Sequence, residues 1–481
     1  MVTTMTDSMK KDSFIRICNI RIEGMKNIKK GEIEFYKLTD LKNKLTISDN
    51  SIWGIYGQNG SGKTTVIETT EFLKSLLSDR PFDMDTSEKL RIAEYINKEI
   101  KQAKNTYTFF CQAENYTALL EYVFCYSLIN DKEAVLSEEE LSETLYDHEN
   151  QKWKRKKKLF QFNRSERSLS LPLQSGSQSR TDQKVLKERL LSYTDLNKLD
   201  SSIFSRQAFS VLKDLPLAHD FRSAITVLKD FATKDLIVIR NKIIGEQLGQ
   251  LLMINFLVED EESLVKGTIP IETSADRKSR IPLDYFSAFK TACQQMNIAL
   301  KQIVDGMTLA IKNEETIPDK DGIMWVTFDM VSVRNGLQIP LQFESEGIKR
   351  IISVLNALIF FYSSANACVL IDEMDSGVYE YLLGELLVSL AKSGKGQLIF
   401  TAHNLRPLER LGKDHIIFST ANPEDRFLVH TGIKPTNNLR EVYLREIFFG
   451  SEQSEPLSSR INASSIELAI RKAGKIHGKA Q

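Results

Sequence analysis

The residues best suited to chemistry lie between Gly57 and Thr65, in the run Gly-Gln-Asn-Gly-Ser-Gly-Lys-Thr-Thr. This run contains the pattern G-x-x-x-x-G-K-[ST], whose glycines let the backbone curl so that its amides face a phosphate group. The ammonium group of Lys63 would reach the β- and γ-phosphates of a nucleotide, and the hydroxyl group of Thr64 would bind Mg²⁺. We therefore expect a nucleoside triphosphate site that is formed by Gly57, Gln58, Asn59, Gly60, Ser61, Gly62, Lys63, Thr64 and Thr65.

The segments on either side of this loop favour the same interpretation. Residues 51–56 form an apolar run that is typical of a buried strand, and residues 65–73 have the pattern of a helix. A helix that begins near Lys63 would add the positive end of its dipole to the loop. The alternative is a glycine-rich turn that binds nothing, and the flanking strand and helix disfavour it.

Another apolar strand, residues 367–373, ends in two carboxylates. Ligands of a parallel α/β sheet bind at the carboxyl ends of its strands, so we expect Asp372 and Glu373 to lie beside the phosphates. Asp372 would bind Mg²⁺ through water or Thr64, and Glu373 would polarise the attacking water, because phosphoryl transfer depends on positioning and charge neutralisation. The alternative is a strand followed by an ordinary acidic turn.

A third apolar strand, residues 398–403, ends at His403. About 30 residues, including a predicted helix over 379–391, separate His403 from Glu373, which is the spacing of a βαβ crossover. The imidazole would then face the γ-phosphate. A single histidine at a strand end also has a structural interpretation.

Ser345 and Gly347 precede a long apolar helix, predicted over 351–362. The helix N-cap and a close approach of the backbone are expected at these two positions. An ordinary helix start is the alternative.

The length, composition and charge of the chain limit the class of protein. The chain has 481 residues, 42% of them hydrophobic, so we expect two substructures or one domain with large insertions. Its 64 basic and 64 acidic side chains cancel, which argues against coating nucleic acid through bulk charge. The scattered cysteines and the absence of a long apolar run predict a soluble, reduced, cytoplasmic protein without structural zinc or a membrane segment. These cysteines are Cys18, Cys111, Cys125, Cys293 and Cys368.

Alternating polar and apolar residues predict strands in several places. Residues 14–22 and 31–35 indicate a hairpin, and strands are expected over 116–126, 141–146 and 159–162 within a β-rich region, 107–173. The turn Asn335-Gly336 predicts a hairpin between strands at 325–328 and 331–341. Helices are predicted over 87–103, 202–254 and 285–303, with an acidic loop over 259–276.

The order of these motifs resembles that in ATPases of the ABC, SMC and RecF type. Ser345-Glu-Gly347 resembles their Ser-Gly-Gly signature, with Glu346 in place of the first glycine, as in relatives of the RloA and OLD-like ATPases. Asp375 and the serine after it resemble the D-loop. Gln207, in Phe-Ser-Arg-Gln, resembles the Q-loop glutamine that helps to bind Mg²⁺, although a surface glutamine is the alternative. The resemblance is specific over residues 14–77 and 320–420.

The resemblance implies an α/β fold: an ABC-type P-loop ATPase head with a mixed sheet flanked by helices, an antiparallel β subdomain and a short helical insertion. It divides the chain into an ATPase lobe with the phosphate loop (1–200), a helical insertion (201–315), a second ATPase lobe (316–450) and a tail (451–481). It implies ATP and Mg²⁺ as ligands and ATP hydrolysis, with Glu373, Lys63 and His403 as catalytic residues. The metal ligands would be Thr64, Asp372 and Gln207.

In this family ATP lies between two heads. Ser345, Gly347 and Asp375 would therefore contact nucleotide, with the Ser345–Gly347 segment of one protomer meeting the γ-phosphate held by its partner. The resemblance implies a homo-oligomer, at least a dimer when ATP is bound.

Compact heads without coiled-coil arms resemble the ATPase subunits of bacterial anti-phage systems, including the RloA-like and Septu ATPases. The Septu partner is an HNH nuclease. The resemblance thus implies a subunit that regulates a partner nuclease, without nuclease activity of its own, and residues 464–473 are a candidate docking helix. The alternative is a RecF-like DNA-repair ATPase, for which the basic stretch 152–167, with eight Lys and Arg, would contact DNA. A solvated strand face also explains that stretch. A transporter ATPase is disfavoured by the long 107–341 insertion.

Overall fold

The structure is a computed structural model of the chain. It describes residues 2–5, 14–45, 47, 51–79, 92–113, 116–172, 180–213, 217–240, 251–259, 264–272, 278–420, 422–424, 426–428, 439–441 and 443.

A six-stranded sheet carries the phosphate loop, with the strand order β11-β18-β19-β4-β20-β21. Its first five strands are mutually parallel, and β21 is antiparallel to β20. The carboxyl ends of the parallel strands therefore meet at one edge, where ligands of such sheets bind. These elements are β11 (Leu236–Ile239), β18 (Cys368–Ile371), β19 (Gln397–Thr401), β4 (Ile52–Gly57), β20 (Ile416–Ser419) and β21 (Phe427–Leu428).

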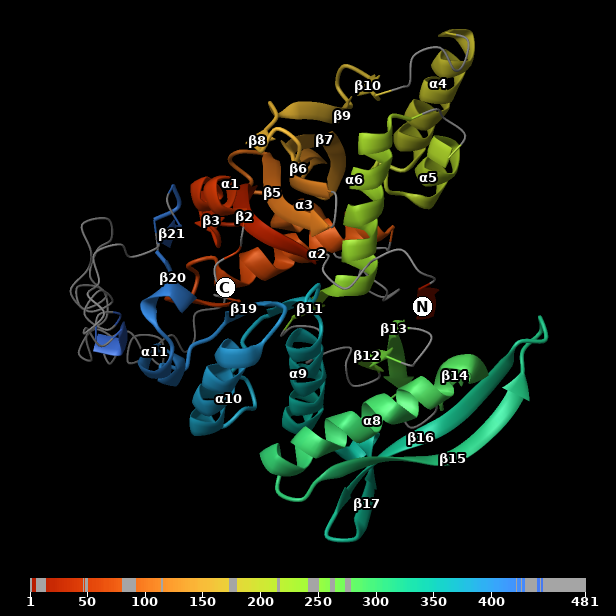
Figure 1. Ribbon diagram of the computed structural model, residues 1–481, viewed down its shortest axis with the longest axis vertical. Coiled ribbons are helices and arrows are strands. Elements are labelled where there is room, and N and C mark those ends of the chain that lie inside the picture. Colours follow the sequence, from red (N-terminus) through yellow and green to blue (C-terminus); the bar gives the residue numbers. More distant parts are fainter. Residues whose placement is uncertain are drawn as a thin grey trace, which may run out of the picture.

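Helices cover both faces of this sheet. In β18, Cys368 and Leu370 belong to one hydrophobic core, and Val369 and Ile371 belong to another, because successive strand residues point to opposite faces. The helix α2 (Lys63–Ser78) packs into the first core, and α9 (Glu346–Ser363) and α10 (Glu380–Ser393) pack into the second. Figure 1 shows α2 above the sheet and the α9–α10 pair below it. Burial on both faces is what a parallel sheet requires.

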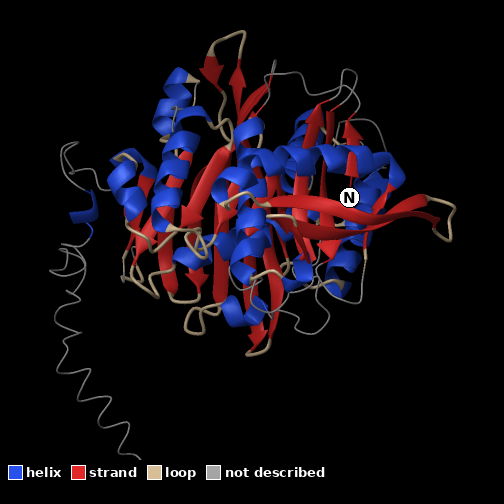
Figure 2. Cartoon of the chain, turned by 90° about the horizontal axis from the view of Figure 1, so that it is seen from below, coloured by secondary structure: helices blue, strands red, loops and turns tan. Residues whose placement is uncertain are grey.

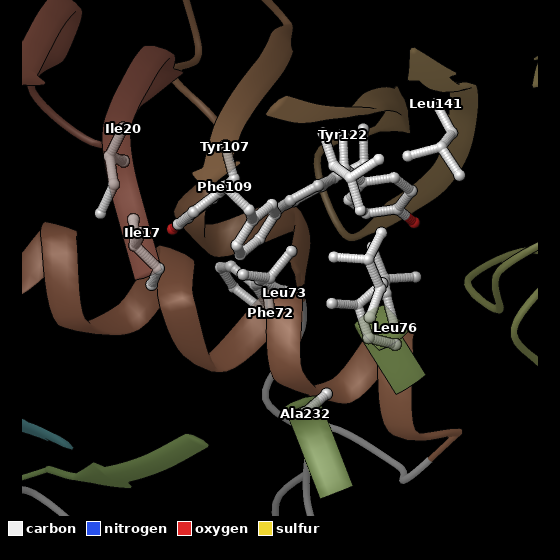
Figure 3. Close-up of a cluster of buried hydrophobic side chains, with 14 of the residues drawn as sticks. Ile17, Ile20, Phe72, Leu73, Leu76, Tyr107, Phe109, Tyr122, Leu141 and Ala232 are labelled. Atoms are coloured by element: carbon white, nitrogen blue, oxygen red, sulfur yellow. The ribbon is translucent and has the colours of Figure 1, made fainter. Parts of the chain in front are cut away.

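An antiparallel sheet of eight strands covers the other side of α2, with the order β10-β9-β7-β6-β5-β2-β3 and β8 paired to β7. The antiparallel sheet lies above α2 in Figure 1, and Figure 2 shows the same strands and helices from below. In Figure 3, Phe72 and Leu73 of α2 lie below Tyr107 and Phe109 of this sheet, and Leu76 lies below Tyr122. The strands are β2 (Phe14–Met25), β3 (Ile28–Glu34), β5 (Gln102–Ala113), β6 (Tyr116–Asn130), β7 (Glu133–Asp147), β8 (Lys152–Trp153), β9 (Lys157–Asn163) and β10 (Ser168–Ser170).

A helical segment leads from this antiparallel sheet back to the parallel one. It contains α4 (Arg180–Leu196), α5 (Arg206–Lys213) and α6 (His219–Asp230), and the π-helix Phe231–Asp235 connects α6 to β11. Phe221, Ile225 and Leu228 of α6 are buried in the same core as α2. Short helices elsewhere are α1 (Leu38–Lys44), α3 (Ile92–Tyr95) and α11 (Arg406–Arg410), together with the 3₁₀ turns Leu341–Phe343 and Lys413–His415.

A third core lies on the other side of α9. Ile352 and Leu355 of α9 pack there with Phe286 and Phe289 of α8 and with Phe328 of β16. Two small sheets complete this part, in the lower half of Figure 1. Their elements are β1 (Val2–Met5), β12 (Leu251–Glu259), β13 (Leu264–Glu272), β14 (Ser279–Pro282), α8 (Leu283–Ile303), β15 (Thr308–Pro318), β16 (Met324–Arg334) and β17 (Leu337–Pro340).

The structure confirms the expected fold class, a mixed sheet flanked by helices with an antiparallel β subdomain. The β2–β3 hairpin and α8 lie where the sequence predicts them. The Asn335-Gly336 turn joins β16 to β17, and both residues have the positive φ angles, 48° and 80°, that this hairpin turn needs. The sequence predicts separate strands at 325–328 and from residue 331, but the structure has one continuous strand, since β16 runs without a break from Met324 to Arg334.

Three predictions between the motifs are wrong. The helix over 87–103 is reduced to α3, because β5 begins at Gln102; residues 80–91 are outside the described residues. The helical prediction for 202–254 holds for α5 and α6, but β11 and β12 replace it further on. The acidic loop over 259–276 contains β13, in which Pro270 pairs with Met253. Among the described residues, β1 pairs with residues 264–267 and only β12 pairs with Pro270, and a missing N–H is tolerated at such an edge position.

Candidate nucleotide site

The loop between β4 and α2 has the backbone that phosphate binding needs. Gly60 and Gly62 have φ angles of 79° and 91°, and Gly62 is the N-cap of α2. A Cβ atom on Gly62 would lie 2.8 Å from the side chain of Ile28, so this position has neither the conformation nor the space for another residue. No protein acceptor in the described part of the chain receives the N–H groups of Gly62, Lys63 or Thr64. The first turn of α2 therefore presents free donors and the positive end of the helix dipole.

Strand β20 holds the loop from the side. Ser61 and Ser419 share a hydrogen bond of 2.5 Å between their hydroxyl groups, and Ser419 Oγ also donates to the carbonyl of Tyr56 at 3.2 Å. A Cβ atom on Gly57 would lie only 2.1 Å from Ser419 Oγ. On the other side, the Asn27 amide donates to the carbonyl of Gly60.

Lys63 is folded back over the loop. Its ammonium group donates to the carbonyl oxygens of Gly57 at 2.7 Å and Gln58 at 3.1 Å, and the residue is only 7% exposed. Burial lowers the pKa of Lys63, and the nearby carboxylates of Asp372 and Glu373 oppose this shift. The ammonium group thus lies between the loop and the acidic strand end.

The acidic strand end touches the first turn of α2. Oδ1 of Asp372 accepts hydrogen bonds from the hydroxyl of Thr64 at 3.2 Å and from that of Thr401 at 2.7 Å. The backbone N–H of Asp372 donates to the carbonyl of Ile239, at the end of β11. Two oxygen ligands of the kind that Mg²⁺ prefers therefore lie side by side, next to the free amides of the loop.

Glu373 has an unusual backbone conformation, with a positive φ of 46°. Its N–H donates to Thr401 Oγ1 at 2.8 Å, so one hydroxyl group joins Asp372 and Glu373. The carbonyl oxygens of both residues accept hydrogen bonds from the guanidinium of Arg350, that of Glu373 at 3.4 Å. A left-handed residue other than glycine is kept only where its surroundings fix it, and such residues cluster at functional sites.

Asp375 and His403 meet through the backbone. Oδ2 of Asp375 accepts hydrogen bonds from the N–H groups of His403 at 2.9 Å and Asn404 at 2.7 Å. The carboxylate therefore fixes the loop that follows β19, and the His403 side chain is exposed at the same edge as Glu373. Oδ1 of Asp375 is buried and has no hydrogen-bond partner among the described residues.

The signature residues lie at the start of α9. Ser345 is the N-cap, and its hydroxyl accepts a hydrogen bond from the N–H of Ile348 at 3.3 Å. Gly347 faces the turn after Glu373, where a Cβ on Gly377 would lie 3.2 Å from the Cα of Gly347. In the described part of the chain, no hydrogen bond joins Ser345 or Gly347 to residues 57–65. Gly347 thus lies against the turn after Glu373, and its segment makes no hydrogen bond to the phosphate loop among the described residues.

The structure contradicts the role predicted for Gln207. Its neighbour Arg206 donates a backbone N–H to the carboxylate of Asp79, which is the C-cap of α2. The 16 residues of α2 span about 24 Å, and the phosphate loop lies at the opposite end. A glutamine side chain cannot cover this distance, so Gln207 is an exposed residue of α5 and not a ligand beside Thr64. The Phe-Ser-Arg-Gln match is local and carries no information about position in the sheet.

Several residues that contact the phosphate loop or the acidic strand end are absent from the site predicted from the sequence. Thr401 has a weak signal, as a polar residue at the end of an apolar strand. Arg350 is one of three charged residues near the start of α9, with Glu346 and Lys349, so its charge alone does not mark it. Asn27 and Ser419 have no signal in their own segments, because their contacts are with a loop far away in the sequence.

The basic stretch 152–167 is paired within the chain. The ammonium groups of Lys156, Lys157 and Lys158 lie 2.5, 3.4 and 2.9 Å from carboxylates of Glu121, Asp220 and Glu140, respectively. Arg164 donates to backbone carbonyls. This pairing favours the interpretation as a solvated strand face.

A family described as "AAA domain, putative AbiEii toxin, Type IV TA system" matches residues 52–408, most of the chain. The chain belongs to this family. The matched span of the AAA domain includes the phosphate loop, the signature, Asp372 with Glu373, and His403. The described nucleotide site therefore lies within an AAA domain.

Solved structures similar to this AAA-domain chain include two Smc heads. One is the SmcHead bound to the C-winged helix domain of ScpA, and the other is an Smc head domain with an extended coiled coil bound to the C-terminal domain of ScpA derived from Pyrococcus furiosus. Each is 13% identical, with a TM-score of 0.39, over 86% of this chain and 96% of that chain. No curated protein matches the sequence. Among the described residues, no helix is both long and apolar enough to cross a membrane.

Proposed function

We propose that this protein is the ATP-binding and ATP-hydrolysing subunit of a bacterial anti-phage defence complex, in which it regulates a partner nuclease. The observation that carries the nucleotide part is the contact of Thr64 with Asp372 at the free N-terminus of α2. A helix end, a lysine and an oxygen pair converge there on one small volume. The defence role extends the resemblance to compact, armless heads of anti-phage ATPases, and it accords with a family named after a toxin–antitoxin system.

Each residue of the site would have a separate role in ATP binding or hydrolysis. The amides of Gly62, Lys63 and Thr64 would bind the phosphates, and Lys63 would exchange its two carbonyl contacts for phosphate oxygens. Thr64 and Asp372 would hold Mg²⁺, which neutralises charge on the phosphates when bound. Glu373 would orient and polarise the attacking water, and His403 would stand beside the γ-phosphate. Asp375 would keep the His403 loop in place.

The position of the signature segment, Ser345–Gly347, supports a dimer of this chain. Gly347 faces the turn after Glu373, and no hydrogen bond in the described part of the chain joins Ser345 or Gly347 to the phosphate loop of the same protomer. We propose that ATP is bound between head-to-head protomers, with the Ser345–Gly347 segment of one protomer completing the site of its partner. ATP would then stabilise the dimer, because it contacts both protomers only in the closed state.

Calorimetric titration of the full-length protein with ATP and Mg²⁺ tests the nucleotide part, with phosphate release measured in parallel. We expect saturable binding, turnover, and a shift from monomer to dimer in light scattering. A protein that gives no heat with Mg-ATP would contradict the proposal. For the defence role, coexpression with the product of the neighbouring gene should give a copurifying complex whose nuclease activity depends on ATP; a protein that stays alone and whose turnover rises with DNA would instead indicate DNA repair.

A further inference from the structure

Arg350 is the buried cation that connects the signature helix to the acidic strand end. It lies one turn into α9, three residues after Gly347, and is 2% exposed. One guanidinium nitrogen, Nη2, donates to the carbonyl oxygens of Asp372 and Glu373. The other two, Nε and Nη1, are buried and have no hydrogen-bond partner among the described residues.

This arrangement is a poor way to stabilise a core. Taking a guanidinium out of water is costly, and its cost is offset only when its donors are satisfied. Burial also lowers the pKa of Arg350 to about 10, against the opposing effect of nearby carboxylates. Replacing incompletely paired buried charges by apolar side chains of similar volume is often neutral or stabilising. Stability alone therefore does not account for an arginine here.

The segment that Arg350 contacts does need to be held. Glu373 has a φ of 46°, so its left-handed backbone must be fixed by its neighbours. Thr401 fixes the N–H side, and Arg350 fixes the carbonyl side of Asp372 and Glu373. Arg350 lies on the helix that Ser345 caps, so one helix carries the signature and also contacts the backbone of Glu373.

We propose that Arg350 is a positioning residue for ATP hydrolysis, which couples engagement of the signature by the partner's nucleotide to the placement of Glu373 in the same chain. The inference rests on the proposed ATP-bound dimer. It adds a connection between the two composite sites of that dimer: nucleotide on one protomer, contacted by Ser345 and Gly347 of the other, sets the position of Glu373 at the second site. Turnover should then depend cooperatively on ATP.

The test compares Arg350→Met with Arg350→Lys and with Arg16→Met as a matched control. Arg16 is also a buried arginine, 7% exposed, that donates to backbone carbonyls, those of Ala365 and Lys395, at the opposite end of β18 and β19. For each variant the Kd for Mg-ATP, kcat, the Hill coefficient of turnover and Tm are measured on the full chain.

We expect Arg350→Met to keep its Tm and its Kd, to lose its cooperativity, and to lower kcat about 100-fold, the size of effect that a small misplacement at a reacting centre produces. Arg350→Lys should recover part of kcat, because an ammonium group still donates to Asp372. Arg16→Met should lower Tm and leave the kcat of the folded protein unchanged.

Three results would overturn the inference. One is Arg350→Met with the kcat and Hill coefficient of the wild type. Another is a loss of kcat in Arg350→Met that only follows a loss of Tm. The third applies if Arg350→Met does not fold. In that case a folded Arg350→Lys with the turnover and cooperativity of the wild type would overturn the inference. A wild-type protein that does not bind Mg-ATP is a different result: it removes the proposed function itself, and the inference with it.

Discussion

The hydroxyl group of Thr64 donates a hydrogen bond of 3.2 Å to Oδ1 of Asp372, a residue 308 positions away in the sequence. This contact joins the first turn of α2 to the end of β18. It places a hydroxyl and a carboxylate oxygen next to a helix N-terminus, which is the arrangement that a Mg²⁺-bound polyphosphate requires. Four predictions depend on the contacts around it or on the fold that maintains it.

Lys63→Ala should abolish ATP binding. Lys63 is the one side-chain cation that hydrogen-bonds to the loop carbonyls of Gly57 and Gln58 among the described residues, and its loss removes the charge that would meet the phosphates. Calorimetric titration with Mg-ATP measures the effect. Lys156→Ala is the control, because Lys156 directly precedes β9 of the antiparallel sheet and pairs with Glu121. Equal affinity of Lys63→Ala and the wild type would contradict the role of Lys63.

Glu373→Gln should keep ATP binding, slow hydrolysis and accumulate an ATP-bound dimer. The amide fills the same space but cannot take up a proton from the attacking water, so chemistry is lost while the phosphate contacts remain. Phosphate release and light scattering with ATP are the two measurements. Glu314→Gln on β15 is the control, since Glu314 pairs with Lys290 on the surface. Unchanged turnover in Glu373→Gln would exclude Glu373 as the base.

Thr401→Val should impair hydrolysis more than ATP binding. The change removes the donor to Asp372 and leaves the N–H of Glu373 without this acceptor, at a cost of about 1–3 kcal/mol. Thr401→Ser retains the hydroxyl group and is expected to behave like the wild type. The measurement is kcat together with the free energy of unfolding in urea. If serine and valine lower kcat equally, the hydroxyl bridge between Asp372 and Glu373 is not what matters.

Glu139→Gln should destabilise the antiparallel sheet, most strongly at low pH. The buried Glu139 carboxylate accepts hydrogen bonds from Tyr122 at 2.6 Å, Ser201 at 2.5 Å, and the N–H of Ser202 at 2.8 Å. Glutamine offers a single acceptor oxygen, and we expect a loss of about 1–3 kcal/mol.

The pH dependence of that loss follows from the direction of the shift. Burial raises the pKa of Glu139 above its ordinary value. Above about pH 4.3 the unfolded chain therefore releases a proton that the folded protein keeps, and wild-type stability falls as the pH rises towards the raised pKa. The difference between wild type and Glu139→Gln should shrink over this window in urea unfolding. Glu140→Gln, one residue along β7 on the opposite face, should change stability by less than about 0.5 kcal/mol. A difference that grows with pH would contradict this assignment.

The sequence predicts some parts of this molecule well for a physical reason. The phosphate loop, its strand and its helix are contiguous, so the glycines, Lys63 and the apolar flanks can be interpreted together. Asp372 and Glu373 are predictable because a parallel sheet brings all carboxyl ends of its strands to one edge. His403 is placed at that edge by the same rule.

Other parts depend on contacts that no local pattern contains. The four-residue strand β11 is too short for its periodicity to be distinguished from the helices before it, although it neighbours β18 in the sheet. The prediction for Gln207 fails for the same reason, since a four-residue match does not specify which end of α2 it approaches. Arg350 donates to backbone carbonyls, which have the same chemistry at every residue, and Thr401 contacts Asp372 and Glu373 from a neighbouring strand.

The order in which the sheet is completed has a consequence for synthesis of the protein in the cell. Strand β4 pairs with β19 and β20, and Ser61 bonds to Ser419, 358 residues later. At about 5–20 residues per second, a ribosome needs roughly 20–70 s to add that stretch. During this interval the nascent chain exposes an apolar strand that has neither of its two neighbours, a surface that invites chaperone binding or aggregation. A truncated product that ends before residue 397 would carry an intact phosphate-binding sequence and no sheet to hold it.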